Sequence, residues 1–207
     1  MESLRTSILI IPVVVALAAC STGAGDGEVR GSVSLPDCGL ARTDWNMGVD
    51  FFAASYYENT LAIRLQNTGQ DQAFSDGLLI MVRDVEFVSK RLGEKLTITV
   101  EPDIDTFVDA GPDAGIPVTT HGSPARATLY LNDSCPGNHY GFTDGEGELT
   151  LDSIYVPDEE KRVAGSFKLR FVDPRSWKSS DDIGPHAELE GDFDFNYARG
   201  SPAQTFP

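Results

Sequence analysis

The alternation of apolar and polar residues along the chain is the feature that most limits its fold. In residues 187–197 the large apolar side chains occupy odd positions and the acidic side chains occupy even positions. Successive side chains of a β-strand point to opposite faces, so this segment is predicted to be a strand with one buried and one solvated face. Residues 60–66 and 163–172 repeat the pattern.

Turn-forming residues separate the alternating segments at short intervals, which is typical of an all-β sandwich or barrel. We predict about eight to nine mainly antiparallel strands. The candidate strands are residues 29–35, 48–55, 60–66, 77–82, 95–100, 125–131, 146–154, 163–172 and 187–197.

Residues 84–93 are the segment with helical spacing, since Val85, Val88 and Leu92 would share one helix face. Asp84 is a suitable N-cap and Gly93 is a suitable C-terminal residue. We predict one short helix here, covering an open end of the β-structure. Residues 102–124 and 177–185 have no period and are predicted to be exposed loops.

A short apolar run, residues 8–17, precedes Cys20. It is too short to span a bilayer, which takes about 20 residues, so it fits a signal peptide. Its end resembles the bacterial lipobox, a Leu-small-small-Cys pattern, here Leu17-Ala18-Ala19-Cys20. The resemblance implies cleavage before Cys20 and attachment of diacylglycerol and a further acyl chain such as palmitate. The alternative is an ordinary signal peptide with an incidental Cys20.

This interpretation divides the chain into residues 1–19 as signal peptide, 20–28 as flexible tether, 29–200 as one β-rich domain and 201–207 as tail. It places the protein in the cell envelope, held to a membrane by lipid on Cys20. Ser21, in place of an aspartate, resembles the sorting pattern for the outer membrane.

The cysteine count supports export. If Cys20 carries lipid, Cys38 and Cys135 remain as a pair in an oxidising compartment, where such pairs form disulfides. The bridge would close a loop of about 97 residues, for which the chain-entropy model gives roughly 4–5 kcal/mol.

The net charge of −16 opposes binding to nucleic acid. It favours basic partners or divalent cations, unless it serves solvation alone. The sequence predicts no cofactor. The best metal candidates are weak: an EF-hand fails because Phe107 and Val108 replace a ligand and the glycine, which leaves a looser calcium site. Its carboxylates would be Asp103, Asp105, Asp109 and Asp113.

Catalytic signatures are weak. His121, His139 and His186 are far apart in sequence and accompany no hydrolase or zinc-protease motif. An enzyme is therefore less favoured than a binding protein.

Aromatic residues supply the candidate binding surface. Trp45, Tyr56 and Tyr57 follow Cys38 and either pack around a disulfide or form a recognition patch. Trp177, between Arg175 and Lys178, is the strongest candidate for an exposed aromatic residue in a loop.

Three predicted strand segments follow one another in the last third of the chain, at residues 147–151, 163–167 and 189–195. This series resembles the C-terminal part of uncharacterised bacterial lipoproteins. The tail, residues 199–207, and Cys135-Pro136 are similar to those of myxobacterial lipoproteins of unknown function. The resemblance implies a β-rich envelope lipoprotein and carries no activity.

Two function classes remain open. The first is a lipid-anchored module that binds an envelope protein or glycan through its loops. The alternative is a small-ligand carrier or enzyme with a pocket inside the β-structure, since barrels often enclose ligands.

Overall fold

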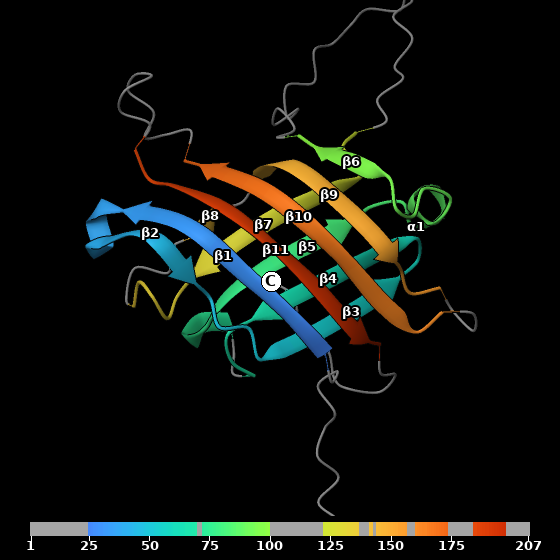
Figure 1. Ribbon diagram of the computed structural model, residues 1–207, viewed down its shortest axis with the longest axis horizontal. Coiled ribbons are helices and arrows are strands. Elements are labelled where there is room, and N and C mark those ends of the chain that lie inside the picture. The colour runs from blue at the N-terminus through green and yellow to red at the C-terminus, as the bar shows by residue number, and fades with distance from the viewer. Residues whose placement is uncertain are drawn as a thin grey trace, which may run out of the picture.

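The protein is a β-sandwich of two antiparallel sheets with one short helix, which confirms the predicted all-β class. The computed structural model describes residues 25–69, 72–99, 122–136, 141–142, 144–156, 160–173 and 184–197. One sheet has six strands in the order β2-β1-β11-β10-β9-β6, and the other has five in the order β3-β4-β5-β7-β8. Figure 1 shows the strands of one sheet crossing those of the other rather than running alongside them. Of the two predicted architectures, the sandwich is the correct one.

The bounds of the six-stranded sheet are β1 Gly25–Leu35, β2 Leu40–Asn46, β6 Lys95–Ile98, β9 Gly145–Ser153, β10 Arg162–Val172 and β11 His186–Asn196. Those of the five-stranded sheet are β3 Phe51–Tyr57, β4 Thr60–Gln66, β5 Asp76–Val82, β7 Ala125–Leu131 and β8 Gly141–Phe142. The helix is α1, Val85–Ser89, and two 3-10 turns are η1, Pro36–Cys38, and η2, Gln72–Phe74.

The nine predicted strands all occur, and β2 and β8 are additional. Four consecutive residues of β2, from Ala41 to Asp44, are exposed, so the strand carries no apolar alternation that could reveal it. β8 has only two residues. A further correction concerns residues 25–28, assigned above to the tether: they form the start of β1 and pair with β11.

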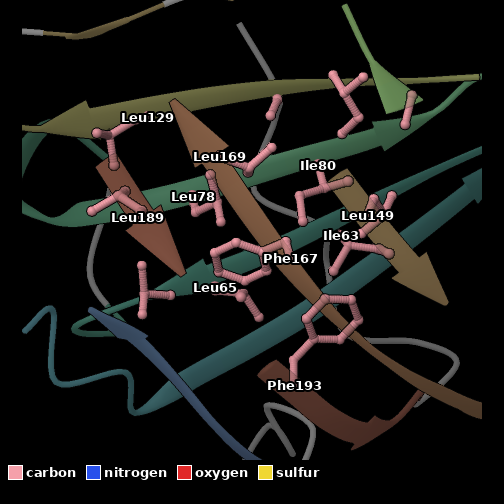
Figure 2. Close-up of a cluster of buried hydrophobic side chains, with 14 of the residues drawn as sticks. Ile63, Leu65, Leu78, Ile80, Leu129, Leu149, Phe167, Leu169, Leu189 and Phe193 are labelled. Carbon is pink, nitrogen blue, oxygen red and sulfur yellow. The ribbon is translucent and has the colours of Figure 1, made fainter. Parts of the chain in front are cut away.

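The core lies between the sheets and is made by the apolar positions that the alternation marked. Figure 2 shows these side chains from both sheets meeting in one layer. Its members from β10 and β11 include Phe167, Leu169, Leu189 and Phe193, each at most 3% exposed. The opposite sheet contributes Ile63, Leu65, Leu78, Ile80 and Leu129, all fully buried. Burial of the apolar face of each strand between the sheets fixes the register of both sheets.

Glycines on the inner face make room for aromatic rings. Gly191 pairs with Phe167 across β10 and β11, and a Cβ there would lie 2.7 Å from the Phe167 ring and 2.0 Å from the Glu28 carbonyl oxygen. Gly145 lies in the same way beneath Phe171, at 2.5 Å from its ring. The glycine that interrupts the apolar series of β11 therefore serves close packing.

Helix α1 connects β5 of one sheet to β6 of the other, and it buries Val85 and Val88. The Asp84 carboxylate accepts a hydrogen bond from the Phe87 amide at 2.8 Å, as a capping residue does. The helix is shorter than predicted: it ends at Ser89, and turns continue to Gly93, whose φ of +78° suits glycine. Leu92 consequently lies outside the helix and is 43% exposed.

Among the described residues no helix is long and apolar enough to cross a membrane.

Candidate functional site

A disulfide joins the two sheets at one end of the sandwich. Cys38 closes η1 directly after β1, and Cys135 follows β7. The two residues are bonded, with their Cα atoms 5.5 Å apart, which confirms the predicted pair. We call this region the disulfide end: η1, the η2 loop and residues 132–136.

A buried carboxylate organises the loop that carries Cys135. Asp76, at the start of β5, is 2% exposed. Its carboxylate accepts hydrogen bonds from the amides of Asp133 and Ser134, both at 3.0 Å, and from the Ser134 hydroxyl. The Asp76 amide donates to the Asn67 side chain at 3.0 Å, and the Asn67 side chain donates to Asp133 at 2.9 Å. Asp76 thus links the start of β5 to the loop after β7 and to Asn67.

A second network surrounds Gln66 on the outer side of the five-stranded sheet. The Gln66 amide group donates to the Ser75 hydroxyl at 3.0 Å and to the Thr68 carbonyl. Its oxygen accepts from the Tyr130 hydroxyl at 2.8 Å. The Tyr130 ring lies over Gly77, where a Cβ would come within 2.2 Å of it. The donors and acceptors of buried Gln66 are therefore matched inside the protein.

Burial sets the ionisation of both networks. Desolvation raises the pKa of Asp76 above its ordinary value, although the hydrogen bonds from Ser134 and Asp133 oppose the shift. Desolvation also raises the pKa of Tyr130 to about 12, against the attraction of the Arg64 guanidinium. Tyr130 therefore stays neutral and keeps the proton that it donates to Gln66.

An exposed aromatic residue directly precedes Ser75 and Asp76, which belong to the two networks. Phe74 ends η2, is 67% exposed, and is followed directly by the buried residues Ser75 and Asp76. The Asn132 side chain donates to the Gln72 carbonyl at 2.8 Å and secures the other side of the turn. Sequence reasoning missed Phe74. The available signal was a single large apolar residue in the polar segment 67–75.

The outer face of the six-stranded sheet is charged. The predicted acidic series of β11 does lie on this face, with Glu188, Asp192 and Asp194 exposed and Glu190 partly exposed. Cations on the neighbouring strands separate these acids. The ion pairs are Arg30–Glu190 at 3.4 Å, Lys168–Glu190 at 3.5 Å, Arg170–Glu188 at 3.8 Å and Arg162–Asp194 at 2.5 Å.

The charged rows continue onto β9 and β6. Arg170 also contacts Glu146 at 3.4 Å, and Lys95 contacts Glu148 at 2.8 Å. The hydrogen bond from Lys95 lowers the pKa of Glu148, and the one from Arg162 lowers the pKa of Asp194. These two acids belong to a ladder of exposed cross-strand ion pairs, each of which contributes little to stability.

A shallow hollow of about 690 Å³ lies on this charged face beside the edge strand β2. Its polar lining includes Arg30, Asp44, Asn46, Lys168 and Glu188. Charges of both signs alternate around it, so the hollow selects no single charge class of ligand.

The predicted aromatic candidates separate into different environments. Trp45 is 7% exposed and packs in the core, which leaves its ring little surface for a ligand. Tyr56 is partly buried and contacts the Tyr155 ring edge-on at 5.6 Å. Tyr57 is 74% exposed. Trp177 lies outside the described residues.

The remaining candidates offer no metal or catalytic cluster within the part of the chain that the structure describes. The carboxylates Asp103, Asp105, Asp109 and Asp113 lie outside it, as do Cys20, His121 and His139. Nδ1 of His186 lies 2.7 Å from the Gly184 carbonyl. No group of three or more metal-ligating side chains occurs among the described residues.

Comparisons of the chain with protein-family models, with curated proteins and with solved structures found no match.

Proposed function

We propose that the chain is a lipid-anchored protein of the cell envelope that acts as a binding module. Lipid on Cys20 attaches it to a membrane, the outer membrane where the host has one. The disulfide end, with Phe74 at its surface, is the part that meets a partner.

The distribution of the cysteines supports the anchor. Cys38 and Cys135 are bonded to each other, so Cys20 is the remaining cysteine of the chain. A disulfide between two strand-connecting loops suits an oxidising compartment. Cys20 follows the leucine and two alanines of the lipobox pattern.

Phe74 is the observation that carries the proposed binding role. Contact of an exposed phenylalanine ring with water is unfavourable, and a partner that covers the ring removes it. Aromatic side chains also dominate the binding energy of many interfaces. The described residues on either side of it are held by hydrogen bonds, from Gln66 to the Ser75 hydroxyl and from Asn132 to the Gln72 carbonyl, so residues 72–75 would lose little conformational entropy on binding. The apolar side chains of the two sheets bury one another between the sheets, which favours a module over a carrier with an internal pocket.

Site-specific photo-crosslinking in intact cells tests this role. We expect p-benzoylphenylalanine at position 74 to form one discrete adduct with a partner. The matched control places the same group at Ser166, which is exposed on the outer face of the six-stranded sheet, and should give no such adduct. Absence of an adduct at position 74, or the same adducts at both positions, would contradict the proposal.

A further inference from the structure

The sandwich is firmly structured from the first residue of β1. Gly25 pairs with Phe195, and a Cβ at Gly25 would lie 2.3 Å from the Phe195 Cβ. Pairing continues without interruption to Ser34 and His186. Four residues, 21–24, therefore separate Cys20 from the first strand of the domain.

The greatest reach of this connection is short compared with the length of the domain. The step from Cys20 to Gly25 spans at most about 17 Å when fully extended. β1 has 11 residues, which corresponds to about 36 Å along the sandwich. Figure 1 shows the start of β1 beside the end of β11, and the turn from β1 into β2 at the opposite end. A lipid on Cys20 therefore cannot reach past the disulfide end.

Tyrosines gather where β1 begins. Tyr197, two residues beyond the partner of Gly25, stacks on Tyr155 with ring centroids 3.9 Å apart. Tyr155 in turn contacts Tyr56, whose neighbour Tyr57 is 74% exposed at the β3–β4 turn. We call this region the anchor end.

The charges at the anchor end are mixed. Arg162 holds Asp194 through two hydrogen bonds of 2.7 and 2.5 Å, and Lys161 is exposed. Asp26 and Glu160 are exposed as well and would remain in water at an interface. Tyrosine and lysine are residue types that favour the boundary between lipid and water.

We propose that the anchor end rests on the membrane surface, with Tyr57 in the headgroup region and the disulfide end pointing away. The orientation rests on the proposed lipid anchor. Its direct consequence is that Phe74 faces the medium or a neighbouring envelope component instead of the bilayer.

Lipid crosslinking of the full-length protein tests the orientation. The protein extracted from membranes is reconstituted into vesicles of phosphatidylethanolamine and phosphatidylglycerol. One variant carries Tyr57→p-benzoylphenylalanine and the matched variant carries Phe74→p-benzoylphenylalanine; both native side chains are well exposed. After irradiation we expect phospholipid adducts several-fold more abundant at position 57 than at position 74.

The mass of the Cys20 peptide shows whether a negative result contradicts the orientation alone or the lipid anchor as well. In an acylated protein, lipid adducts that are absent at position 57, or as abundant at position 74, overturn the orientation while the anchor stands. A Cys20 peptide without acyl chains contradicts the anchor itself and the orientation with it. The Cys20→Ser variant, which cannot be acylated, should give adducts at neither position.

Discussion

At the scale of single residues, Asp76 shows how one buried acid shapes the disulfide end. Its carboxylate receives two backbone amides and a hydroxyl from the loop after β7, and that loop carries Cys135. The same burial that makes these bonds strong also disfavours the charge, so that the pKa of Asp76 is raised.

Replacing Asp76 tests this balance. Asp76→Ala leaves buried donors without an acceptor and should lower the free energy of unfolding by about 1–3 kcal/mol. Asp76→Asn keeps one acceptor oxygen and removes the charge. Because the folded protein binds the Asp76 proton more tightly than the unfolded chain, the wild type should gain stability relative to Asp76→Asn as the pH falls through the raised pKa. Denaturant titrations across acidic pH measure the difference, and a constant difference would contradict it.

Gly191 provides a second test at this scale. A methyl group there would meet the Glu28 carbonyl and the Phe167 ring, so Gly191→Ala should destabilise the fold by about 1–3 kcal/mol. Gly69→Ala is the matched control, since its nearest contact would be an ordinary 3.5 Å. Thermal unfolding of both variants checks the prediction. Equal stabilities would show that Gly191 is not required for packing.

At the scale of elements, the alternation of the sequence predicts the strands that contribute to the core. It does not predict the elements whose presence or length depends on local contacts. Strands whose sequence alternates between apolar and polar residues, such as β4 and β7, have the predicted bounds. Strand β2 was not predicted because its central residues are exposed on both faces. The helix ended early because its capping and turn geometry, more than the spacing of Leu92, set its length.

The candidate site was less predictable for the same reason. The cysteine count predicted the disulfide, because only two cysteines remained once Cys20 was assigned to lipid. The exposure of Phe74 was not predictable in this way, because the η2 turn contacts a residue far along the chain: the Asn132 side chain donates to the Gln72 carbonyl.

The disulfide is expected to stabilise the folded sandwich. Cys38→Ser with Cys135→Ser removes the link between η1 and the loop after β7, which closes a separation of 97 residues. The chain-entropy model predicts a loss of roughly 4–5 kcal/mol in the free energy of unfolding. Guanidinium unfolding of the double variant and of the wild type measures the loss. An unchanged midpoint would show that the bridge does not stabilise the sandwich.

At the scale of the whole molecule, the fold separates the two ends of the sandwich. Strand β1 begins at the anchor end. The opposite end holds the disulfide, the buried acid Asp76 and Phe74. The net charge of −16 is carried in part on the outer face of the six-stranded sheet, where cations on β1 and β10 partly offset it.

The proposed role and orientation depend most on how the three cysteines are divided between lipid and disulfide. Non-reducing peptide mass spectrometry of the protein extracted from membranes measures this division directly. We expect an N-terminal peptide that begins at Cys20 and carries diacylglycerol and an acyl chain, together with a crosslinked peptide that contains Cys38 and Cys135. An unmodified Cys20 peptide, or a disulfide that includes Cys20, would contradict it.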